Sequence, residues 1–141
     1  MPVTCLTEAD VRAYLVDQAA QANALDFGMD FTTADITAAM NRCAREYNGM
    51  MPSVDFVSGS FLPAETNAFL DGVALHLYII KLQHEQKQDI EYAAGEVNAS
   101  AAGTQIKHCI ANIKMFGDRF REAALLRKRD RNNRAAYGNI G

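Results

Sequence analysis

The stretch Val-Ala-Leu-His-Leu-Tyr-Ile-Ile-Lys-Leu, residues 73–82, decides the fold of this chain. It is apolar on almost every side of a helix, but a membrane-spanning helix needs about 20 such residues, so we expect a helix buried in protein. Such a helix needs neighbours on all sides, and a small bundle offers few of them. A second subunit is one way to supply the rest. The candidates for that subunit interface are Leu75, Tyr78, Ile79 and Leu82.

A first helix start lies near the N-terminus. Thr7 and Asp10 have the spacing of a capping box, in which each side chain accepts a hydrogen bond from the backbone amide of the other residue. Leu6 and Val11 flank them at the positions of a hydrophobic staple. Apolar residues then recur every three or four positions, which predicts a helix over about residues 8–25.

The same pattern recurs in the stretch Phe31-Thr32-Thr33-Ala34-Asp35-Ile36. Here Asp35 is the box partner, and the first and last residues of the stretch form the staple. The helix that follows is expected to stop at Asn48-Gly49, ahead of Pro52. A short turn around residues 26–28 would join it to the first helix.

The remaining elements follow from turn formers and spacing. Residues 53–62 predict either a short strand or an extended connection, and Pro63 suits the first turn of a third helix. Small residues over 93–104 predict a loop, after which an apolar stripe predicts a fourth helix that ends near Asp130. The expected fold is mainly α, a small bundle of about four helices with a short extended connection and a flexible C-terminal tail over 131–141.

Composition places the chain in a broad class and gives no chemistry. Its 141 residues are 49% hydrophobic with a net charge of -3, which predicts one folded helical domain, here assigned to residues 1–130. An odd number of cysteines, three, argues against a disulfide-stapled secreted module and favours a reducing cytosol. The N-terminus has neither the basic run nor the apolar core of a signal peptide.

Charge is distributed unevenly along the chain. Residues 119–134 hold seven basic side chains against two acidic ones, a net of +5 that leaves -8 for the rest. A helix dipole explains two or three cations at a helix C-terminus but not seven in sixteen positions. The alternative is contact with an acidic partner, either nucleic acid or a protein surface. Tyr137 and Ile140 would be apolar anchors of a tail that becomes ordered on docking.

The search for catalytic or metal-binding patterns gives little. His76 and His84 are eight residues apart rather than three or four, and Cys-x-x-Cys and His-Glu-x-x-His patterns are missing, so no metal site is expected. Cys43 and Cys109 lie on apolar helix faces, where a thiol is normally an unreactive core residue with a raised pKa. We therefore expect no enzyme activity, no catalytic residues and no cofactor.

The order of elements resembles the head-to-tail adaptor (connector or neck) proteins of tailed bacteriophages. The resemblance is carried by Phe31-Thr32-x-x-Asp35-Ile36 leading to Glu46-Tyr47-Asn48-x-x-x-Pro52, by the long apolar helix, and by the small-residue loop. The basic helix and a tail of Gly, Asn and Tyr complete it. It covers nearly the whole chain as an order of elements, and none of its residues is a catalytic fingerprint.

The resemblance implies a virion structural protein of the neck, made in the host cytoplasm. It would form a dodecameric ring that joins the portal protein to a downstream tail or nozzle protein, and double-stranded DNA would pass without specific binding. No membrane is involved. The residues implied in docking to the portal or a neighbour are Arg127, Lys128, Arg129, Arg131, Arg134, Tyr137 and Ile140. The alternative function is a small helical nucleic-acid-binding regulator that uses the basic segment.

Overall fold

The computed structural model describes residues 4–15, 31–64, 67–93 and 99–137. Within these ranges the chain is mainly α-helical, as the sequence predicts, and contains no named strand. The elements are α1 (Glu8–Leu15), α2 (Thr33–Gly49), the 3-10 turn η1 (Gly59–Phe61), α3 (Ala68–Ala93) and α4 (Ala99–Tyr137). None of the helices in the described ranges is long and apolar enough to cross a membrane.

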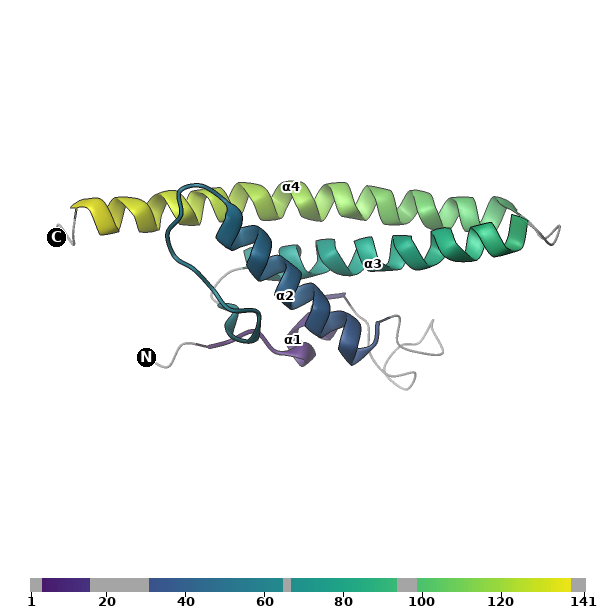
Figure 1. Cartoon of the computed structure of the whole chain (residues 1–141), viewed down its shortest axis with the longest axis horizontal. Coiled ribbons are helices and arrows are strands. Elements are labelled where there is room, and N and C mark those ends of the chain that lie inside the picture. Colours follow the sequence, from purple (N-terminus) through teal and green to yellow (C-terminus); the bar gives the residue numbers. More distant parts are fainter. Residues whose placement is uncertain (1–3, 16–30, 65–66, 94–98, 138–141) are drawn as a thin grey trace.

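The helices α3 and α4 form an antiparallel hairpin that runs along the long axis of the molecule (Figure 1). Helix α2 lies across this hairpin, and α1 lies near the N-terminal half of α2. The C-terminal end of α4 projects past the start of α3 (Figure 1). At 1.5 Å per residue, the 39 residues of α4 span about 58 Å. The fold is therefore a long hairpin supported on one side by shorter helices.

Both predicted helix starts are confirmed. The amide of Thr7 donates to the carboxylate of Asp10 at 2.9 Å, and the amide of Asp10 donates to the Thr7 hydroxyl at 3.3 Å. Thr32 and Asp35 form the same reciprocal box at the start of α2. The end of α2 at Gly49 is also as predicted. Residues 16–25 of the expected first helix, and the turn at 26–28, lie outside the described residues.

The core forms where α2, α3 and α4 meet. Gly72 of α3 lies at this crossing, because a Cβ atom there would come within 2.6 Å of the Cys43 sulfur and 2.8 Å of the Phe120 ring. Further along, Tyr78 lies between two other rings, with centroids 6.0 Å from Phe31 and 5.8 Å from Phe116. The chain thus supplies many of the neighbours that its apolar helix requires.

Both expected boundaries of the fourth helix are wrong. The fourth helix does not end near Asp130 but continues to Tyr137, because no Gly or Pro interrupts it between Gly117 and residue 138. Residues 131–137 are therefore helix rather than flexible tail. At its other end, α4 begins at Ala99, so the later part of the expected loop over 93–104 is helical.

The connection between α2 and α3 is extended and includes the turn η1, so of the two alternatives for residues 53–62 the connection is correct. Pro63 is not in the first turn of α3, which begins at Ala68. It forms an isolated antiparallel bridge with Cys5 instead. Its missing amide leaves this pairing intact, because the two backbone bonds come from the amides of Leu6 and Ala64.

Candidate partner-docking surface

The basic segment of α4 separates into an internal part and an exposed part. Arg127 and Lys128, both expected to dock a partner, face the interior of the chain: the Lys128 side chain is fully buried, and only 14% of the Arg127 side chain is exposed. Both contact the connection that follows α2. Arg127 therefore ties α4 to the connection and Lys128 is packed inside the chain, so any docking surface must be built from other residues.

The internal part centres on Asp55, which lies in the connection after α2. Its carboxylate accepts hydrogen bonds from the Tyr47 hydroxyl at 2.6 Å and from Arg127 Nε at 2.9 Å. Arg131 Nε lies 4.0 Å away. Burial raises the pKa of Asp55, but the two hydrogen bonds and the charges of Arg127 and Arg131 outweigh it, so the pKa lies below its ordinary value. Asp55 is therefore a fixed anion that ties the connection to α4.

Lys128 lies beside this carboxylate in an aromatic box. Its ammonium is 4.6 Å from the centroid of the Tyr47 ring and 5.3 Å from that of Phe56. No hydrogen-bond partner for Nζ is found among the described residues. Burial lowers the pKa of Lys128, and the charge of Asp55 opposes this only in part. Attraction to the two aromatic rings and to the charge of Asp55 therefore offsets part of the cost of removing this ammonium from water.

A second ion network joins α2, α3 and α4. Glu46 of α2 contacts His76 of α3 at 2.8 Å and Arg121 of α4 at 3.2 Å. The hydrogen bond from His76 lowers the pKa of Glu46; burial opposes this shift, and the charges of His76 and Arg121 add to it. Like Asp55, Glu46 pairs with a cation of the basic segment, Arg121, from within the same chain.

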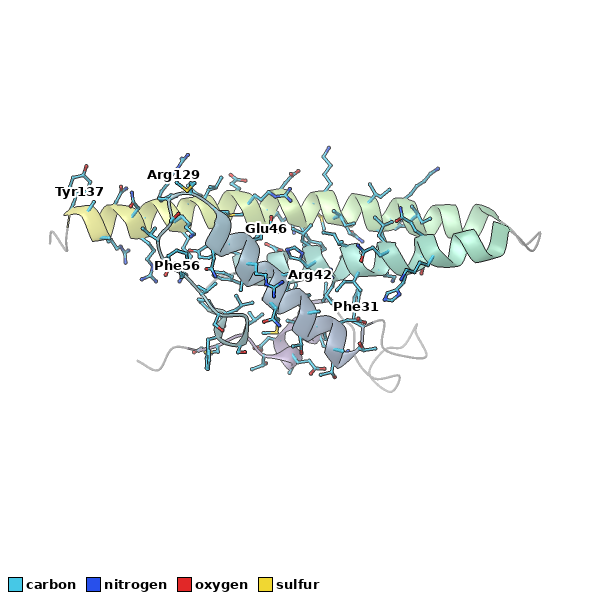
Figure 2. All side chains as sticks on the ribbon, in the orientation of Figure 1. Phe31, Arg42, Glu46, Phe56, Arg129 and Tyr137 are labelled. Carbon is cyan, nitrogen blue, oxygen red and sulfur yellow. The ribbon has the colours of Figure 1, made fainter. Side chains whose placement is uncertain are left out.

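The exposed part of the basic segment is the projecting end of α4. Arg129 and Tyr137 lie on it, away from the other helices (Figure 2). Tyr137 is 74% exposed, and the Arg134 side chain, 64% exposed, pairs with Asp130 at 3.2 Å. Arg131 is partly exposed. Ile140, the last of the expected docking residues, lies outside the described residues.

Exposed apolar side chains lie elsewhere than expected. Of the interface candidates on α3, Leu75 is buried in the chain's own core, and Tyr78, Ile79 and Leu82 are half-buried. The large apolar side chains that are exposed in the described residues belong to α4 and to the connection after α2. They are Met51, Phe56, Phe61, Ile110, Met115, Leu125, Leu126 and Tyr137.

Sequence reasoning missed this set apart from Tyr137, which it predicts as a docking anchor. The connection did contain a signal. Met51, Phe56 and Phe61 are large apolar residues in a segment rich in turn-forming residues, and they do not belong to the apolar face of any predicted helix. On α4, Leu125 and Leu126 fall off the stripe that contains Phe120 and Ala124.

The described residues bring together no group of three or more side chains that could hold a metal ion. Cys43 is buried, and burial, with the charge of Glu46, raises the pKa of its thiol. It is the core thiol that its place on an apolar face predicts. The exposed side chains of the projecting end of α4 are arginines, Asp130 and apolar groups.

Comparison with known proteins adds no relative: no protein-family model, curated protein or solved structure matches this chain.

Proposed function

We propose that this protein is a head-to-tail adaptor of a tailed bacteriophage, a structural protein that joins the portal ring to the next tail component. The observation that supports it most is the surface of the projecting α4 end and the neighbouring connection. Exposed apolar side chains such as Phe56 and Leu126 occur there together with Arg129 and Arg134. Arginines and aromatic residues are enriched where proteins bind one another.

The internal ion contacts support an adaptor role by making the projecting end rigid. Asp55 holds α4 through Arg127, and Glu46 holds it through Arg121, six residues earlier. A surface that is fixed before binding loses little conformational freedom when a partner docks. A subunit that must join two other rings in a fixed geometry benefits from this rigidity.

The charge of the chain supports passage of DNA rather than its capture. Outside residues 119–134 the net charge is -8, so most of the protein repels a phosphate backbone. Within the basic segment, Arg127, Arg121 and Arg131 lie within 4.0 Å of carboxylates of the same chain. In a ring that lines a channel, such a subunit would leave the duplex free to slide.

The test is assembly with a portal protein. We expect rings, or a monomer that assembles into a ring on the portal, in negative-stain images and native mass measurements made with and without portal. Changing Arg129 to Gln should weaken portal binding at least fivefold, whereas Lys114→Gln, which removes an exposed charge elsewhere on α4, should not. A protein that stays monomeric and ignores the portal contradicts the proposal.

Nucleic-acid binding is the alternative function, and the exposed arginines favour it. Arg129, Arg131 and Arg134 are the exposed or partly exposed cations of the projecting end, and if all three contacted phosphates, duplex affinity would fall with salt at a slope of about -3 on logarithmic axes. Substituting all three with Gln should then abolish the slope. If no duplex binding is measurable at low salt, this alternative is excluded.

A further inference from the structure

A small hollow lies between the start of α2 and the middle of α3, and the proposed function leaves it unused. It has a volume of about 220 Å³, less than the 300–1,000 Å³ typical of ligand pockets, which suits a single protein side chain. Phe31 and Ile80 are buried and form its apolar part. The residues that line it are Phe31, Asp35, Ile80, Lys81, His84 and Glu85.

The surroundings of the hollow are acidic. Asp35 and Glu85 line it together with one cation, Lys81, whose ammonium lies 6.0 Å from the centroid of the Phe31 ring. Glu8 of α1 lies near the start of α2, where it accepts a hydrogen bond from the Thr33 hydroxyl at 3.0 Å, and it pairs with Arg12. Among the residues that line the hollow, two carboxylates stand against one ammonium, so the hollow favours an apolar side chain that arrives with positive charge.

The projecting end of α4 carries such a side chain. Tyr137 is an exposed aromatic residue, and Arg134 precedes it by three positions, so both lie on neighbouring parts of one helix face. Together with Arg129 and Arg131, and against Asp130, this end has a net charge of +2. It therefore matches the hollow in size and in charge.

The end of α4 cannot reach the hollow of its own chain. The Phe31 ring contacts Tyr78, which stacks on Phe116, so the hollow lies level with Phe116 of α4. From Phe116 to Tyr137 the helix rises by about 31 Å. Phe31 and Tyr137 lie correspondingly far apart in Figure 2. The side chain that enters the hollow must come from another molecule.

We propose that Tyr137 of one copy enters the hollow of the next copy, with Arg134 beside Asp35 and Glu85. This inference rests on the self-assembly that the proposed function requires, and it names the joint between subunits. The two contacting surfaces are different parts of the chain, so the contact is head-to-tail, and repeated head-to-tail contacts close into a ring where the rotation allows.

The test is cross-linking between two differently labelled copies, in a background where the half-buried Cys5 is Ser. One copy carries Asn133→Cys, one turn from Tyr137, and the other carries His84→Cys at the hollow. A short bifunctional thiol reagent should link the mixed pair at least tenfold more than a pair in which Ser60→Cys, exposed on η1, replaces His84→Cys. The reaction is run with and without portal.

Two further variants test the side chains themselves. Tyr137→Ala in the Asn133→Cys copy should reduce the cross-link at least fivefold. Leu126→Ala, which removes another exposed apolar side chain 11 residues earlier and so on nearly the same face of α4, should leave it unchanged. Thermal melting of each variant verifies that the helices remain folded. Equal loss with both variants would overturn the role of Tyr137.

A charge exchange tests the electrostatic part of the joint. Glu85→Lys or Arg134→Glu alone should reduce the cross-link at least fivefold, and a chain that carries both changes should recover it. If rings form but the cross-link does not, the proposed contact between Tyr137 and the hollow is contradicted, whereas the adaptor function is not. If neither rings nor cross-links form with portal present, both proposals are contradicted.

Discussion

Asp55 and Arg127, 72 positions apart in the sequence, are joined by a hydrogen bond of 2.9 Å between a carboxylate oxygen and Nε. The Tyr47 hydroxyl donates to the same oxygen, so the end of α2, the connection and α4 meet at one carboxylate. This contact fixes the point beyond which α4 projects. It also fixes exposed Phe56 beside that point, with the buried Lys128 beneath its ring.

Removing the charge of Asp55 should destabilise the fold. Asn tolerates the positive φ of 57° at this position and keeps an acceptor oxygen, so Asp55→Asn removes the anion with little change of shape. A hydrogen bond to a charged group contributes about 1.5–3 kcal/mol, and we expect a loss of that order in urea denaturation. The control is Asp130→Asn, whose exposed pair with Arg134 contributes less than about 1 kcal/mol. Equal effects of the two variants would refute the assignment.

The contribution of Asp55 should disappear in acid. Its pKa is below the ordinary value in the folded chain and about 3.9 in the unfolded chain. Its stabilisation is therefore complete above about pH 4 and is lost as the pH falls through the folded pKa. Denaturation curves from pH 7 to 2 should show wild type and Asp55→Asn converging below about pH 4. A stability difference that persists unchanged at pH 2 would mean that shape, not charge, causes it.

The helix starts could be predicted from the sequence because their signals are local. Thr7 with Asp10, and Thr32 with Asp35, make reciprocal bonds three residues apart, so a short window contains both partners. The end of α4 was missed although its signal is also local. The asparagines at 132–133 suggest a break, but helix formers flank them and the first strong stop is the glycine at 138.

The roles of the basic residues could not be predicted, because their partners are distant in the sequence. Nothing near Arg127 or Lys128 distinguishes them from Arg129, yet two are internal and one is exposed. The difference depends on Asp55 and Tyr47, which reach α4 only after the chain has folded back through α3. Helical periodicity places residues on faces but does not say which face meets a carboxylate.

Gly72 should be intolerant of any side chain. A Cβ there would lie within 3 Å of the Cys43 sulfur and of the Phe120 ring, atoms held by two other helices. Gly72→Ala gains helix propensity, but overpacking costs about 1–3 kcal/mol, so we expect a net loss of stability in thermal melting. Gly49→Ala is the matched control because nothing lies within 4 Å of its Cβ position. A Gly72→Ala variant as stable as that control would refute the close crossing.

Lys128→Met should raise stability at neutral pH. Met fills a similar volume but carries no ammonium. Burying the Lys128 ammonium without hydrogen bonds costs more free energy than its attraction to the two aromatic rings restores. We therefore expect Lys128→Met to raise the free energy of unfolding by about 1 kcal/mol. The pKa of Lys128 is lower in the folded chain than its unfolded value of about 10.4. The cost of burying the charged ammonium is therefore complete below the folded pKa, and it falls as the pH rises because Lys128 loses its proton in the folded chain. In urea denaturation the stability difference between Lys128→Met and wild type should therefore narrow toward pH 10.

The control is Lys128→Ala, which leaves a cavity and should lose about 2–3 kcal/mol of unfolding free energy. If Met also destabilises at pH 7, cation–π attraction exceeds the desolvation cost.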